Sequence, residues 1–303
     1  IMKRKSYQWF LGGVAGLTGF WVGLLVVTKS GMTQSLPVLT PTTPEAVKYL
    51  NQGLQSARRG NTENAIAAFR EAIALDKNLA PAHYNLGLAL REQGELQAAA
   101  DAFYQALVID PNLAIAYASL GAALLEGNNL EQAQIYLDRA LQLSPELGIA
   151  HYNLGLVHRQ QGNPEAAIEH FRSAQKFRPQ APEVPYHLGL AYLEQNQLKA
   201  AKTAFQEAIR LKPNYSEAYY GLGQVWFQQK REPFALASFQ KSIELNPEFA
   251  NGYYAAGVVF FQEEKFQDAA AMLEQAQKLY EEQGEEKWAI YAKQLAELAI
   301  SEQ

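Results

Sequence analysis

The feature that most constrains the fold is a repeat of 34 residues that runs from Ala46 to Gln283 without an insertion. Alanine recurs at the twentieth position of each copy and phenylalanine or leucine at the twenty-fourth, and five copies carry proline at the thirty-second. A glycine recurs at the eighth position, as Gly53, Gly87, Gly121, Gly155, Gly189, Gly223 and Gly257. A long period held over seven copies indicates an array of similar supersecondary units.

Within each copy, the apolar pattern predicts two amphipathic helices that cross closely. Small residues at the eighth and twentieth positions allow the close approach, and proline at the thirty-second ends the second helix. A single pair buries its apolar faces only against the next pair, so the unit must form an array. The turn between the helices is expected near the fifteenth position, at Gly60, Gly94, Asn128, Gly162 and Asn196.

The stretch from His83 to Pro111, HYNLGLALREQGELQAAADAFYQALVIDP, carries the whole pattern and resembles the tetratricopeptide repeat family. The resemblance implies an all-α fold, a right-handed α-solenoid of helix-turn-helix repeats. After the repeats, an apolar stripe with a polar opposite face predicts a capping helix at 284–303. The seven repeats are expected at 46–79, 80–113, 114–147, 148–181, 182–215, 216–249 and 250–283.

The N-terminal part of the chain has a different character. A short basic tail at 1–6 precedes an uncharged, apolar segment at 7–28, which is long enough to span a bilayer as a helix. We expect an uncleaved signal anchor there, with a cleaved secretory signal as the alternative. A proline- and threonine-rich linker is expected at 29–45.

Charge around this segment predicts its orientation. Lys3, Arg4 and Lys5 precede it, so a single-pass membrane protein with a cytoplasmic N-terminus and an extracytoplasmic (periplasmic or lumenal) repeat domain is expected. A cytoplasmic repeat domain is the alternative. Four glycines, Gly12, Gly16, Gly19 and Gly23, fall on one helical face and predict a surface for packing against another transmembrane helix.

Composition and motifs argue against nucleic-acid binding and against catalysis. The chain has 26 basic and 31 acidic residues and a net charge of −5, so no nucleic-acid partner is expected. It has no cysteine, which excludes disulfides, thiolate zinc sites, iron–sulfur clusters and cysteine nucleophiles. No phosphate loop, zinc-protease or nucleophile-elbow motif is present, and His151 and His158 are expected to pack in the core. We therefore expect no enzyme activity, no cofactor, no metal and no small-molecule substrate.

Binding to a protein remains, through the concave groove that the family resemblance implies. Positions two, five, nine, twelve and thirteen of each first helix line that groove in the family. Family members that bind a C-terminal carboxylate use lysine at positions two and five. No copy of this repeat has lysine at either position, which argues against such a carboxylate clamp. The candidate groove residues are Tyr84, Tyr152, Tyr186, Leu190, Tyr220, Gln224, Phe227, Gln228, Tyr254, Val258, Phe261 and Gln262.

Aromatic residues concentrate in the last two repeats. Tyr220 with Phe227, and Tyr254 with Phe261, are seven residues apart, and a glutamine follows each phenylalanine. Aromatic anchors beside amide groups predict a site for an uncharged segment or helix of a partner protein.

Together these observations predict a membrane-anchored scaffold, resembling bacterial and especially cyanobacterial members of the family, that assists assembly of a membrane protein complex. A photosystem-type complex is the most specific expectation. The alternatives are an envelope assembly factor, for pili, outer-membrane proteins or polysaccharide export, and a regulatory subunit that recruits a separate enzyme.

Overall fold

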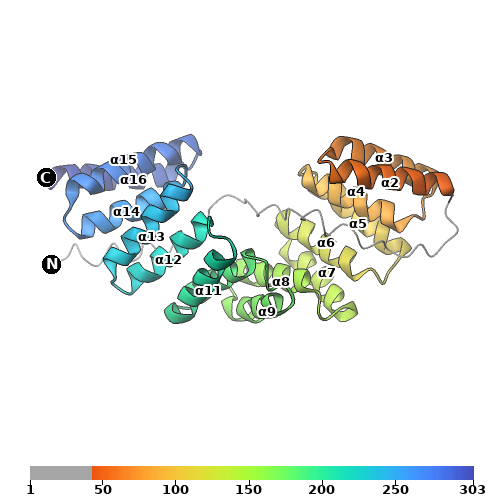
Figure 1. Cartoon of the computed structure of the whole chain (residues 1–303), viewed down its shortest axis with the longest axis horizontal. Helices are drawn as coiled ribbons and strands as arrows, with labels where there is room; N and C mark the ends of the chain where they lie inside the picture. Colours follow the sequence, from red (N-terminus) through yellow and green to blue (C-terminus); the bar gives the residue numbers. More distant parts are fainter. Residues whose placement is uncertain (1–42) are drawn as a thin grey trace. The chain divides into compact units, whose positions relative to one another are not determined.

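The computed structural model describes residues 43–303, which fall into two compact units. We call residues 43–179 the N-terminal unit and residues 180–303 the C-terminal unit (Figure 1). The described residues form helices and contain no strand, so the all-α expectation is confirmed for this part of the chain.

The N-terminal unit contains four pairs of helices. They are α2 (Pro44–Arg58) with α3 (Thr62–Leu75), α4 (Ala80–Glu92) with α5 (Leu96–Ile109), α6 (Ala114–Glu126) with α7 (Leu130–Leu143), and α8 (Gly148–Gln160) with α9 (Pro164–Phe177).

The C-terminal unit contains three pairs and a final single helix. They are α10 (Glu183–Glu194) with α11 (Leu198–Leu211), α12 (Ser216–Gln228) with α13 (Glu232–Leu245), α14 (Ala250–Gln262) with α15 (Phe266–Glu282), and then α16 (Glu286–Ser301). In both units we call the earlier member of a pair the first helix and the later member the second helix.

Local sequence explains where these helices begin and turn. The side chains of Asn61, Asn129 and Asn163 each accept a hydrogen bond from the backbone N–H three residues on, and so cap α3, α7 and α9. The turn residue of every pair has a positive φ, between 54° and 80°. That left-handed conformation costs glycine nothing and is tolerated by asparagine, which is why these two residues dominate the position.

The crossing of the two helices in a pair is tight at the eighth position. A Cβ added to Gly155 would lie 2.5 Å from the ring of Phe171, and one added to Gly189 would lie 2.7 Å from that of Phe205. These phenylalanines occupy the twenty-fourth position and are fully buried. The glycine therefore makes room for the ring that fills the core of its own repeat.

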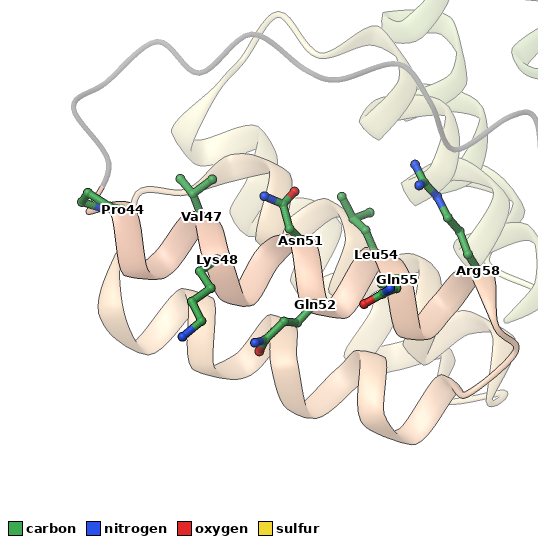
Figure 2. Close-up of a pocket in the computed structure, with 8 residues that line it drawn as sticks. All are labelled: Pro44, Val47, Lys48, Asn51, Gln52, Leu54, Gln55 and Arg58. Carbon is green, nitrogen blue, oxygen red and sulfur yellow. The ribbon is translucent and has the colours of Figure 1, made fainter.

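Within each unit, successive pairs stack through the first helix of the later pair, which contacts the second helix before it, as α4 contacts α3 and α12 contacts α11. In repeats two to seven, the third and tenth positions of the first helix are small or apolar and buried, as in Ala82 and Ala89 of α4. In α2 the equivalent residues are Lys48 and Gln55, which are exposed together with Gln52 (Figure 2). The first described repeat thus presents a polar end, where later repeats present a stacking surface.

The last pair is covered by α16. Ala292 and Ala299 of α16 are fully buried against the C-terminal core, while Lys287, Lys293 and Glu297 are exposed. Two isoleucines, Ile290 and Ile300, interrupt the exposed face.

The predicted localisation, a single-pass membrane protein, is wrong for the part of the chain that the structure describes. Among residues 43–303, no helix is both long and apolar enough to cross a membrane. The longest, α15, has 17 residues, which at a rise of about 1.5 Å each is shorter than a bilayer core, and it carries several charges. The predicted transmembrane segment at 7–28, its face of Gly12, Gly16, Gly19 and Gly23, the tail at 1–6 and residues 29–42 of the linker lie outside the described residues.

Candidate functional site

The candidate site lies on the first helices. In the N-terminal unit, α2, α4, α6 and α8 contact one another in sequence, and in the C-terminal unit α10 contacts α12. We call the exposed side of these helices, together with that of α14, the first-helix surface of each unit. The structure places the predicted groove residues on these helices at very different depths.

In the C-terminal unit, six of the predicted residues keep solvent-accessible area, and Tyr186 of α10 is one of them. Leu190, Phe227 and Phe261 are partly exposed, and Gln228 and Gln262 at the ends of α12 and α14 are exposed. By contrast, four predicted residues are buried: Tyr220, Gln224, Tyr254 and Val258. The accessible part of the predicted site therefore comprises Tyr186 and Leu190 of α10 and the phenylalanine and glutamine side chains at the ends of α12 and α14.

Tyr220 is buried by aromatic neighbours. Its ring centroid lies 5.6 Å from that of Phe239 and 5.2 Å from that of Phe249, which it meets edge to face. The Gln224 side-chain amide donates a hydrogen bond of 3.4 Å to the Tyr220 hydroxyl. Burial raises the pKa of Tyr220, and the nearby Tyr186 and Tyr254 raise it further, so the hydroxyl stays protonated at any physiological pH.

Tyr254 belongs to a second aromatic group that sequence reasoning missed. Its ring lies 6.4 Å from that of Tyr280 and 6.0 Å from that of Trp288. The Tyr280 hydroxyl donates a 2.6 Å hydrogen bond to Oδ1 of Asn251. Burial raises the pKa of Tyr280 far above its usual range, so it remains a donor. The group ties α14, α15 and α16 together, and two of its members, Tyr280 and Trp288, lie outside the positions that repeat.

In the N-terminal unit, Tyr84 is partly exposed and Tyr152 is buried. Tyr84 packs on Phe103, with ring centroids 5.8 Å apart. Burial raises its pKa, while a hydrogen bond with Ser119 and the nearby Arg91 act in the opposite direction. Tyr152 packs on Phe171 at 6.0 Å, and the guanidinium of Arg178 lies 5.8 Å from its ring centroid.

An ion pair on the first-helix surface of the N-terminal unit was also missed. Arg91 at the end of α4 donates from Nε and Nη2 to the carboxylate of Glu126 at the end of α6, at 2.6 to 3.1 Å. Both side chains are mostly buried. The sequence signal was an arginine and a glutamate at adjacent groove positions, twelve and thirteen, of consecutive repeats.

Within residues 43–303, no three His, Asp or Glu side chains are arranged to hold a metal ion. The surface just described offers aromatic rings, amides and one paired charge. Such side chains can bind another protein through apolar contact and hydrogen bonds.

Two family models match these residues. The model described as cilia and flagella-associated protein 70 C-terminal domain matches residues 40–246, which is most of the chain, and the model described as tetratricopeptide repeat matches residues 234–284. The helix pairs with this repeat pattern define a tetratricopeptide repeat protein. More particularly, the chain belongs to the family of the cilia and flagella-associated protein 70 C-terminal domain. No curated protein matches the chain.

Solved structures show the same fold. A chain of the APC/C heterotetramer Cut9–Hcn1 is 20% identical with a TM-score of 0.65, and the match covers 71% of this chain and 43% of that one. Pseudomonas aeruginosa PilF is 23% identical with a TM-score of 0.62, covering 69% of this chain and 95% of that one. YrrB, described as a TPR protein with an unusual peptide-binding site, is 24% identical with a TM-score of 0.52, covering 63% and 98%. This chain thus spans less than half the length of the Cut9–Hcn1 chain.

Proposed function

We propose that the chain is a scaffold that binds a segment of a partner protein on the first-helix surface of the C-terminal unit. The observation that carries the proposal is the row of accessible side chains there: Phe227 and Gln228 at the end of α12, and Phe261 and Gln262 at the same positions of α14. Each ring keeps accessible area while one side of it packs on the protein, as Phe261 does on Phe266 at 5.5 Å.

The chemistry of this row favours an uncharged, partly apolar segment. Each phenylalanine offers apolar area whose removal from water contributes about 25 cal/mol per Å². Each glutamine amide can donate to a main-chain carbonyl and accept from a main-chain N–H. No lysine or arginine stands at groove positions of α10, α12 or α14, so a free carboxylate has no cationic partner in this row.

The finer role that we propose is assistance in assembling a protein complex, without catalytic activity of its own. Binding surfaces repeated along one chain suit a protein that holds segments of its partners. The candidate site contains no nucleophile beside a base and no pair of carboxylates, which supports a binding role.

Display of random peptides against the purified chain tests the proposal. We expect selected peptides to be apolar with few charges, and a Phe227→Ser, Phe261→Ser double variant to bind them at least tenfold more weakly, because both anchors are lost. The control is Tyr104→Ser, which removes a half-exposed ring from the second helix α5. Equal binding by wild type and the double variant, or a loss of binding only in the control, would place the site elsewhere.

A further inference from the structure

Three histidines gather in the last helix pair of the N-terminal unit. His151 and His158 lie on α8, and His170 lies on α9. The ring centroid of His170 is 5.5 Å from that of His151 and 5.3 Å from that of His158. The rings of His158 and His170 are nearly parallel. The Nδ1 atoms of His151 and His170 are 3.2 Å apart. We call these residues the histidine cluster.

Hydrogen bonding limits how many protons the cluster can hold. Nε2 of His151 lies 3.0 Å from the carbonyl oxygen of Pro145, which can only accept, so Nε2 is the donor. One of the two facing Nδ1 atoms must then carry a hydrogen and the other must be bare. A single added proton leaves this bond intact, because one ring remains neutral. A second proton puts N–H groups on both Nδ1 atoms, pointing at each other across 3.2 Å.

The surroundings offer little compensation for added positive charge. From α7, Asp138 faces His158. From α9, the Lys176 ammonium lies 4.9 Å from the ring of Phe177, which stacks on His151. The acidic residue at the end of α6, Glu126, is already paired with Arg91. Nδ1 of His158 is buried and makes no hydrogen bond. One carboxylate can offset one imidazolium, while three imidazoles compete for it.

We propose that the histidine cluster makes the α8–α9 pair acid-sensitive: the pair is held closed while the His151–His170 hydrogen bond exists, and it loosens when both rings take up protons. The cluster is peculiar to this repeat. The twenty-third position, occupied by His170, is alanine, serine, tyrosine or methionine in the other six copies. The helix that loosens also carries Tyr152, so the first-helix surface of the N-terminal unit would change with it.

The direction of the pH effect follows from His170. Burial, together with repulsion from His158 and His151, lowers the pKa of His170 from an ordinary value of 6.5 to about 4. The unfolded chain therefore binds this proton more readily than the folded chain. The stability contributed by the neutral ring is fully present above pH 6.5 and is lost as the pH falls towards about 4.

Hydrogen exchange of the full chain, followed by mass spectrometry between pH 7.5 and pH 4.5, tests this proposal. Rates are corrected for intrinsic exchange, and EDTA is present so that protons are the ligand under test. We expect the open population of α8 and α9 to rise by up to about tenfold per pH unit below pH 6.5. The His170→Met variant has the methionine that repeat seven carries at the same position. In this variant the rise should be largely abolished.

A matched control is His83→Tyr. His83 occupies the same position in repeat two as His151 does in repeat four, and its Nε2 makes the same bond, to the carbonyl of Lys77 at 3.0 Å, but it belongs to no cluster. This variant should leave the pH dependence of α8–α9 unchanged. A direct readout that needs no variant is the NMR titration of the wild-type His170 ring. Titration of that ring near 6.5, or the same pH dependence in wild type and His170→Met, overturns the proposal.

Discussion

At the scale of single residues, the turn between paired helices shows the clearest conflict between position and residue type. Lys230 and Glu264 occupy the turn position with φ values of 57° and 61°, where other repeats have glycine or asparagine. A side chain with a Cβ is strained in this left-handed conformation by roughly 1 kcal/mol. The period of the sequence locates these two turns, although the residues themselves give no turn signal.

Replacing Lys230 or Glu264 by glycine should therefore stabilise the C-terminal unit. We expect each change to raise the free energy of unfolding by about 0.5 to 1 kcal/mol, because relief of strain exceeds the added entropy of the unfolded chain. Urea denaturation followed by circular dichroism measures it. The reverse change, Gly94→Lys, should destabilise by a similar amount, and stabilisation by that variant would contradict the argument.

At the scale of the helix pair, the glycine at the eighth position determines how closely the helices approach. The sequence predicted this crossing from small residues at two positions. The structure adds that the space above the glycine is filled by the side chain at the twenty-fourth position, which is a phenylalanine ring in five repeats and leucine in repeats three and seven. The burial of Tyr220 was harder to predict, because the residue that covers it, Phe249, belongs to the link between two repeats.

Gly155→Ala should destabilise the N-terminal unit by about 1 to 3 kcal/mol, since the new methyl group would overlap the Phe171 ring in a closely packed core. Thermal or urea unfolding gives the value. Gly127→Ala is the matched control, because its Cβ would meet its nearest atom at 3.5 Å, an ordinary contact. Equal losses in the two variants would show that overlap with Phe171 does not decide the outcome, because alanine itself favours a helix more than glycine does.

At the scale of the whole molecule, the described chain divides into two compact units after Pro179, although the 34-residue period runs through that point. The sequence does change there. The last residue of the repeat is Leu79, Leu113, Leu147, Tyr215 or Phe249 in five copies, but Ala181 at the division. Periodicity can be read along the sequence, whereas compactness depends on contacts summed over many residues.

Each unit has its own core, so damage to the final helix should stay in the C-terminal unit. Ala292→Asp places a carboxylate at a fully buried position of α16 and should destabilise that unit by about 3 kcal/mol or more. Hydrogen exchange should report faster opening of α14 and α15 and unchanged protection of α4 and α5. Ile290→Asp, at a position of the same helix that is 54% exposed, should have little effect on either unit.

The polar end of the first described repeat has a consequence for how copies of the chain meet in solution. An array of stacked repeats can in principle grow without limit, since an apolar end of one molecule is a template for the next, and such head-to-tail contacts build filaments instead of closed assemblies. Lys48, Gln52 and Gln55 place charge and amide groups where that contact would form. With these three side chains on α2, adding another copy there would strip water from polar groups without apolar gain, so this end disfavours polymerisation.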